Sequence, residues 1–273
     1  MRLIGSRTKY TYIYIILLIF LGLILIPIFY MILISITPTR ESWLSLIPKH
    51  PTLSIYLTAL RNRKLIHYFI NTWIITGSTV LFVLIIASVG GYGLSRFKFR
   101  GQNVFLFLML ITQGFAPITL SVSYFRIVKI LHLYNTYSFL ILLYISMCLP
   151  FSTLIMRAFF NALPREIEEA AMIDGCSPII LLFKIILPLS WPGLIATGLY
   201  TFIQSWNQYL YPLLFTTDWT RAPITVYLSN LKGQHITDWN QTMAISLLTC
   251  LPAIILYLIF HKQFTQGVAG GLK

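Results

Sequence analysis

Long apolar stretches alternate with short polar connections along most of this chain. A stretch of about 18 or more apolar residues with few charges is a candidate transmembrane helix, because about 20 residues at a rise of 1.5 Å cross the hydrocarbon core of a bilayer. The pattern therefore predicts an all-α, polytopic membrane protein. We expect six transmembrane helices, at residues 12–36, 71–95, 104–125, 136–156, 186–210 and 242–260.

The composition supports one integral membrane domain over residues 1–273. Hydrophobic residues make up 57% of the chain and charged residues 10%, whereas an ordinary soluble domain has roughly 25% charged residues. The first apolar stretch follows Arg2, Arg7 and Lys9, as in a signal peptide. It is longer than a typical signal sequence and has no small-x-small cleavage site after it, so we expect it to be retained as a span.

Basic residues near the ends of the spans indicate the orientation. Six spans place both termini on one side of the membrane, and the short basic turn at residues 96–101 favours the cytoplasm for that side. The segment 261–273 is then a cytoplasmic tail. The net charge of +13 is attributed to anionic lipid headgroups, and no nucleic-acid partner is expected, because no basic stripe accompanies a nucleic-acid-binding fold.

The chain offers little for catalysis. It has no GxxxxGK[ST] loop for ATP and no convincing pairing of a nucleophile with a base, so we expect a protein that is not an enzyme and has no catalytic residues. Three cysteines and five histidines are scattered without metal-ligand spacing, and we expect neither a metal site nor a cofactor bound by this chain.

The segment 163–188 is different from the rest of the chain. Four of the seven acidic residues lie between Glu166 and Asp174. Pro164 suits a first helical turn, Gly175 suits the end of that helix, and Ser177 suits the N-cap of a second one. The pattern predicts two short helices bent at residues 174–176, which a soluble partner could grip. An amphipathic helix lying on the membrane surface is the alternative.

The spacing within this segment resembles a known signature. Glu169-Ala170-Ala171, three residues, Gly175, nine residues and then Ile185-x-Leu187-Pro188 resembles the EAA motif of ATP-binding-cassette (ABC) importer permeases, with Cys176 where alanine is usual. In that family the motif forms coupling helices that dock on the cytoplasmic ATPase. The resemblance implies ATPase contacts by Glu169, Ala170, Ala171, Asp174 and Gly175.

Further strings resemble the carbohydrate-uptake branch of the family, of the maltose-transporter type. They are FINTWIITGSTV, YGLSRFKFRGQN, NTYSFLILLY and SWNQYLYPLLF, in that order. The resemblance implies a permease in the bacterial plasma membrane that forms half of the path for a sugar or a glycosylated polyol. It also implies a second homologous permease, two ATPase subunits that hold ATP and magnesium, and an extracytoplasmic solute-binding protein.

Polar residues within the spans are candidates for the substrate path, because polar groups are costly in lipid and tend to face the protein interior. The best cluster lies in the fifth span and comprises Gln204, Trp206, Asn207 and Gln208; the matching family string usually has an acid where Gln208 stands. Second choices are Thr112, Gln113, Gly114, Tyr144 and Ser146. Alternatively, these groups only bond neighbouring helices.

The predicted outside loop, residues 216–241, has two expected roles. Trp219 and Trp239 suit anchors at the membrane interface, and the resemblance implies contact with the binding protein at Asn230, Lys232, Gly233 and Gln234. A proton- or ion-coupled secondary transporter is the alternative function. The absence of an ionisable residue well inside any predicted span argues against that alternative.

Overall fold

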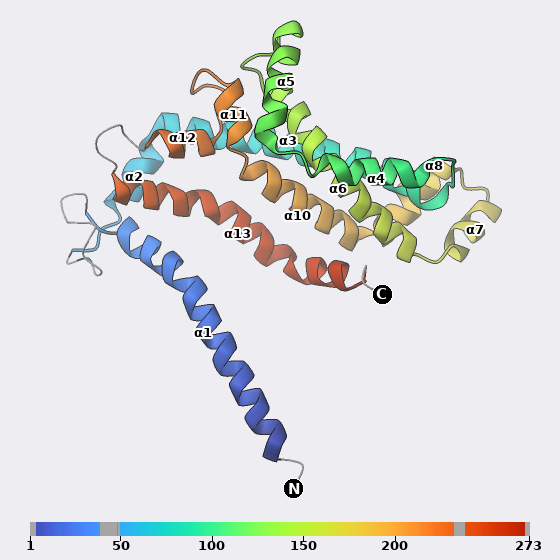
Figure 1. Cartoon of the computed structure of the whole chain (residues 1–273), viewed down its shortest axis with the longest axis horizontal. Coiled ribbons are helices and arrows are strands. Elements are labelled where there is room, and N and C mark those ends of the chain that lie inside the picture. The colour runs from blue at the N-terminus through green and yellow to red at the C-terminus, as the bar shows by residue number, and fades with distance from the viewer. Residues whose placement is uncertain (1–3, 39–47, 49, 232–237, 271–273) are drawn as a thin grey trace. The chain divides into compact units, whose positions relative to one another are not determined.

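The computed structural model describes residues 4–38, 48, 50–231 and 238–270, and every regular element in these ranges is a helix (Figure 1). The long helices are α1 (Ile4–Ser35), α3 (Arg63–Arg96), α6 (Tyr137–Ala162) and α13 (Trp239–Gly270). Each of these contains a stretch long and apolar enough to cross a membrane. The other helices in the described ranges are α2 (Ser54–Arg61), α4 (Gln102–Thr112), α5 (Pro117–Ile130), α7 (Glu166–Ile173), α8 (Pro178–Leu181), the π-helical turn η1 (Leu182–Ile186), α9 (Leu187–Leu189), α10 (Trp191–Trp206), α11 (Leu210–Phe215) and α12 (Ile224–Asn230).

The chain divides into two compact units. One comprises Met1–Arg63 and Leu228–Leu251, and the other comprises Lys64–Tyr227 and Pro252–Lys273. Within the first unit, the Asn240 amide donates to the Thr37 carbonyl at 2.6 Å, and the Tyr56 hydroxyl donates to Ser35 Oγ at 2.6 Å. These two bonds join the C-terminal end of α1 to α2 and to the start of α13.

The third predicted span, residues 104–125, is not one continuous helix. It consists of α4 and α5, which are bent by 99° at the break between Thr112 and Pro117. Proline has no backbone N–H, and its ring pushes the preceding residue out of the helical region. Ala116 accordingly has an extended ψ of 130°. The segment keeps the composition of a span, but the prediction of a continuous helix is wrong, because hydropathy averaged over the segment does not reveal the break before Pro117.

The fifth predicted span, residues 186–210, is also wrong in its bounds. An 81° bend at Ser190 separates the segment Pro178–Leu189 from α10, and α10 ends at Trp206. Pro188 and Pro192 lie on either side of this bend and remove two backbone donors, so a straight helix cannot continue through it. The other four predicted spans agree with the helices. Residues 12–36 begin within α1 and end one residue after it, and residues 71–95 lie within α3. Residues 136–156 lie within α6 and its N-cap Thr136, and residues 242–260 lie within α13. The predicted tail at 261–273 is helical as far as Gly270.

Small and hydroxyl-bearing residues allow α3, α6 and α10 to approach one another closely. A Cβ atom added at Gly91 of α3 would stand 2.8 Å from Met156 Cβ of α6, and one added at Gly193 of α10 would stand 2.5 Å from the Phe159 ring. Between α6 and α10, the Ser152 and Thr201 hydroxyls lie 3.1 Å apart. Such contacts are typical of membrane helices, where packing and polar bonds replace the hydrophobic drive to associate.

Polar bonds also fix the N-terminal half of α3. The buried Asn71 amide donates to the carbonyls of Ala222 at 2.8 Å and Thr220 at 3.1 Å, and Thr72 Oγ1 accepts from the Ile224 amide at 2.8 Å. These bonds hold the beginning of α12 against α3. About 20 residues farther along α3, or roughly 30 Å at 1.5 Å per residue, Tyr92 and Arg96 contact α7.

Candidate coupling segment and translocation cavity

The segment around α7 has the two-helix geometry that its sequence predicts. Gly175 has a φ of +82°, its amide donates to the Met172 carbonyl at 3.1 Å, and the Cys176 amide donates to the Ala171 carbonyl at 3.0 Å. These two bonds form a Schellman motif, which ends α7 and favours glycine at the left-handed position. The Ser177 hydroxyl accepts from the Ile180 amide at 3.4 Å as the N-cap of α8, and Pro178 stands in the first turn.

Two details of the segment differ from the prediction. The first helix begins at Glu166, with Arg165 as N-cap, so Pro164 precedes it instead of standing in its first turn. The second helix is not uniformly α-helical: after Leu181 it passes through the π-helical turn Leu182–Ile186, and α9 then continues through Pro188 to Leu189. Proline removes a backbone donor, and a π-turn adjacent to it is a common way to accommodate the lost bond.

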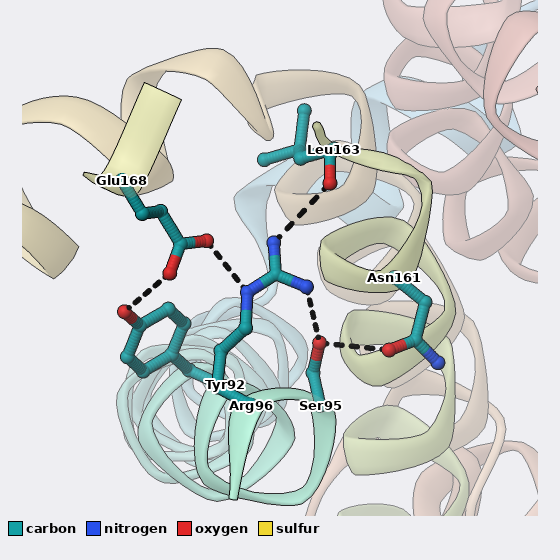
Figure 2. A network of polar contacts seen from close by, with 6 residues as sticks. All are labelled: Tyr92, Ser95, Arg96, Asn161, Leu163 and Glu168. Atoms are coloured by element: carbon teal, nitrogen blue, oxygen red, sulfur yellow. Dashed lines mark hydrogen bonds and ion pairs between the residues drawn. The ribbon is translucent and has the colours of Figure 1, made fainter. Parts of the chain in front are cut away.

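The inner face of α7 is held by an ionic network (Figure 2). Arg96 Nε, at the end of α3, donates to Glu168 Oε1 at 2.6 Å, and the Tyr92 hydroxyl donates to Glu168 Oε2 at 2.9 Å. The Arg96 and Glu168 side chains are only 9% and 8% exposed. The guanidinium also donates to the Leu163 carbonyl at 3.3 Å and to Ser95 Oγ at 3.1 Å, while Ser95 donates to Asn161 Oδ1 at 2.8 Å.

The sequence prediction did not include this network. The sequence does show a basic turn at 96–101 and an acidic cluster at 166–174. Their opposite charges are a clue that the two segments could meet. Which arginine pairs with which glutamate depends on the packing of α3 against α6 and α7, and the sequence does not contain that information in any local pattern.

The outer face of α7 is open. Glu169, Ala170, Asp174 and Gly175 are exposed, as are the neighbouring Met172 and Ile173, the latter to 86%. Ala171, by contrast, is 8% exposed and belongs to the apolar core around Tyr92 and Phe160. Four of the five residues expected to contact an ATPase therefore lie on a free surface, and Ala171 faces the inside of this unit.

A cavity of about 530 Å³ lies among α4, α5, α6, α10 and α11. Its polar lining includes one residue of the predicted path and three of the second choices. These are Gln204, Thr112, Gln113 and Ser146, and they are accompanied by the tyrosines Tyr124, Tyr200 and Tyr211. No Asp, Glu, Lys or Arg lines this cavity within the part of the chain that the structure describes. Amides, hydroxyls and aromatic rings in a largely apolar cleft suit an uncharged polar ligand.

The other predicted path residues do not gather at the cavity. Trp206 is 2% exposed and stacks with Phe202 at 5.1 Å between ring centroids. The Asn207 amide donates to the Ile203 carbonyl at 2.9 Å, and the Gln208 amide to Met147 Sδ at 3.1 Å. Among the second choices, Tyr144 is buried and does not line the cavity. Asn207 and Gln208 follow the end of α10, in a non-helical break before α11.

The predicted outside loop is partly described. Trp219 has an edge contact with His67 and a cation–π contact with Lys64, whose Nζ lies 5.8 Å from the ring centroid. Hydrogen bonds from Thr220 and Asn135 hold the pKa of the exposed Asp218 below its ordinary value. Asn230 is exposed at the end of α12, whereas Lys232, Gly233 and Gln234 lie outside the described residues.

Comparison with known proteins identifies the family. The model of the family described as "Binding-protein-dependent transport system inner membrane component" matches residues 87–270, which is more than half of the chain. The chain belongs to this family. It is a permease component of the ABC importer type, and the ion-coupled alternative is wrong.

Individual relatives agree. The trehalose/maltose transport system permease protein MalG of Thermococcus litoralis is 35% identical over 254 residues, which cover 91% of this chain and 91% of that protein. The sulfoquinovosyl glycerol transport system permease protein SmoH of Agrobacterium fabrum is 32% identical over 83% of this chain and 80% of its own. A solved bacterial ABC transporter involved in the import of the acidic polysaccharide alginate superimposes with a TM-score of 0.82 at 25% identity, over 95% of this chain and 98% of that chain.

Proposed function

We propose that this permease component carries a sugar or a glycosylated polyol, as one of two homologous permeases in a complex with two ATPase subunits and an extracytoplasmic solute-binding protein. Relatives that are named for the transport of maltose, trehalose and sulfoquinovosyl glycerol support a carbohydrate ligand. This chain binds neither ATP nor magnesium in the proposal, because both belong to the ATPase subunits. Its own task is mechanical, and it consists of coupling ATP-driven motion to opening of the path.

The observation that carries the proposal is the two-faced geometry of α7. Its inner face is tied to α3 through Glu168 and Arg96, while Ala170, Ile173 and Asp174 on its outer face are exposed. An exposed isoleucine among acidic residues at the end of a membrane protein suits a soluble partner better than lipid, which would not take up the acidic side chains. In this proposal the ATPase grips the outer face, and the inner connections pass its motion to the spans.

The transport cycle follows from these connections. ATP binding brings the ATPase subunits together, α7 moves with its docking site, and the helices attached to it shift between two packings that open the cavity to opposite sides. Such a switch needs two arrangements of similar free energy, each favoured by a different bound state. The amides of Gln113 and Gln204 and the cavity tyrosines are the groups that bind sugar hydroxyls and ring faces in this proposal.

The proposal also sets the orientation. If α7 contacts an ATPase, then α7, the basic turn at 96–101 and the C-terminal end of α3 lie on the cytoplasmic side. Thr72 and the beginning of α12 then lie on the outer side, because roughly 30 Å of helix separates Thr72 from Tyr92. With six spans both termini are cytoplasmic. A cysteine introduced at Lys273 is then labelled by an impermeant thiol reagent only after the cells are permeabilised, by comparison with the parent chain. Labelling in sealed cells contradicts this orientation.

The test of docking introduces one carboxylate, either on α7 or at the end of α12. Ile173→Glu puts a carboxylate on the exposed face of α7, and Asn230→Glu puts one at the end of α12. The permease complex is reconstituted in nanodiscs, and its affinity for the purified ATPase subunit is measured. We expect Ile173→Glu to weaken binding at least tenfold and Asn230→Glu to leave it unchanged. Equal affinities for both variants and the parent refute the docking role of α7.

A further inference from the structure

The Arg96–Glu168 pair is the one ion pair among the side chains that the structure describes, and it belongs to a membrane protein whose charged residues make up only 10% of the chain. Burying a charge is costly unless it is paired and hydrogen-bonded. Glu168 receives hydrogen bonds from Arg96 and Tyr92, and the Arg96 guanidinium makes further bonds to Leu163 and Ser95. Each partner is therefore bound by several groups at once, which fixes its position.

Helix α7 has few other attachments to the spans. It has eight residues, and only Glu168 and Ala171 are buried. A helix of that length does not persist in water by itself and takes its orientation from its contacts. Ala171 offers one methyl group to the core. The angular position of α7 therefore depends mainly on Glu168.

The geometry of α7 places this attachment opposite its exposed face. At 100° per residue, Ile173 lies about 140° around the helix from Glu168, and Ala170 lies about 160° from it. Rotation of α7 about its own axis would turn Ile173 away from an approaching partner. The Arg96 guanidinium opposes such a rotation, because it binds Glu168 and also the Leu163 carbonyl in the connection that leads into α7 (Figure 2).

We propose that Arg96 is a positioning residue, which holds α7 through Glu168 in the single orientation that presents its outer face to the ATPase. The inference rests on the proposed docking role of α7 and adds how that surface is held in place. Neither Arg96 nor Glu168 touches the ATPase in this account. Without the pair, α7 samples several orientations, and the apparent dissociation constant rises by the inverse of the fraction that is competent to bind. If one molecule in ten keeps the competent orientation, binding weakens tenfold.

The experiment separates positioning from simple stability by neutralising both partners together. Glu168→Gln or Arg96→Gln alone leaves a buried charge without its counterion, and we expect each to lower the amount of permease in the membrane. The double variant Arg96→Gln/Glu168→Gln contains no unpaired charge, so we expect a membrane level close to that of the parent. Its affinity for the purified ATPase subunit in nanodiscs is expected to fall about tenfold. Lys98→Gln, which removes an exposed cation two residues after Arg96, is the matched control and should change neither quantity.

A second variant decides the question if the double variant does not accumulate. Arg96→Lys keeps the charge but cannot bind Glu168, Leu163 and Ser95 together, because an ammonium group lacks the planar fork of a guanidinium. We expect a normal membrane level and ATPase binding weakened several-fold. Parental affinity in whichever of these variants accumulates overturns the positioning role. If Ile173→Glu weakens binding while these variants do not, the positioning role alone fails. If Ile173→Glu also leaves binding unchanged, the docking role of α7 fails.

Discussion

Gly91 provides a direct test of the packing of α3 against α6. A Cβ atom at this position would stand 2.8 Å from Met156 Cβ, 2.9 Å from the Arg157 backbone nitrogen and 3.1 Å from the Thr153 carbonyl oxygen. Carbon atoms in favourable contact lie about 3.5–4.0 Å apart. Two of the three neighbours are backbone atoms, so they cannot move aside as a flexible side chain would. Gly91→Ala therefore forces the two helices apart.

The magnitude follows from two opposing effects. Forcing an extra carbon into a well-packed contact typically costs about 1–3 kcal/mol, whereas replacing glycine by alanine within a helix stabilises it by roughly 0.5–1 kcal/mol. Gly93 lies in the same helix, and a Cβ atom there meets nothing within 4 Å. Because the helical term is common to both sites, the difference between Gly91→Ala and Gly93→Ala isolates the packing cost of about 1–3 kcal/mol.

The assay is thermal unfolding of the detergent-solubilised permease, followed by size-exclusion fluorescence. For a chain of this size a change of 1 kcal/mol shifts the midpoint by about 2–4 °C. A packing cost of about 2 kcal/mol therefore separates the two variants by roughly 4–8 °C, with Gly91→Ala the less stable. Equal midpoints would refute the close approach of α3 and α6 at this position.

Three other predictions concern separate parts of the protein. Gly175→Val places a β-branched residue at a φ of +82°, which costs roughly 1–2 kcal/mol. This variant should bind the ATPase more weakly in nanodiscs. Asparagine tolerates the same backbone conformation, so Gly175→Asn should retain most of the binding. Bonds to Thr220 and Asn135 lower the pKa of Asp218 in the folded protein below the unfolded-state value of 3.8. These bonds therefore stabilise the loop at pH values above 3.8, and the contribution is lost as the pH falls through the lower folded-state pKa. The protection of this loop's amides, which is the intrinsic exchange rate at each pH divided by the observed rate, should therefore fall on acidification in the parent but not in Asp218→Asn. Gln204→Ala removes an amide from the cavity lining and should lower uptake of some sugars roughly tenfold relative to others. An unchanged ranking of sugars would show that this amide makes no selective contact.

The sequence alone determined the class of the protein, most of its spans and the bend beside α7. Long apolar segments predict membrane helices because the thickness of the bilayer sets the length of the hydrophobic stretch. The bend at Gly175 was predictable because its determinants are local: Asp174-Gly175 ends one helix and Ser177-Pro178 begins the next. The spacing of the EAA residues indicated the family, which the comparisons confirmed.

Tertiary structure decided which polar groups meet. Two predicted spans are bent, at 113–116 and at Ser190. A helix broken at proline is stable only where neighbouring helices satisfy the freed backbone groups. Hydropathy does not report those neighbours, so it could not predict the bends. Gln204 lines the cavity while the adjacent Ser205 and Trp206 are buried, since each residue turns 100° around the helix and only the packing of α6 fixes which direction faces the cavity. The pairing of Arg96 with Glu168 joins residues 72 positions apart. It is set by the crossing of α3, α6 and α7, which no local pattern encodes.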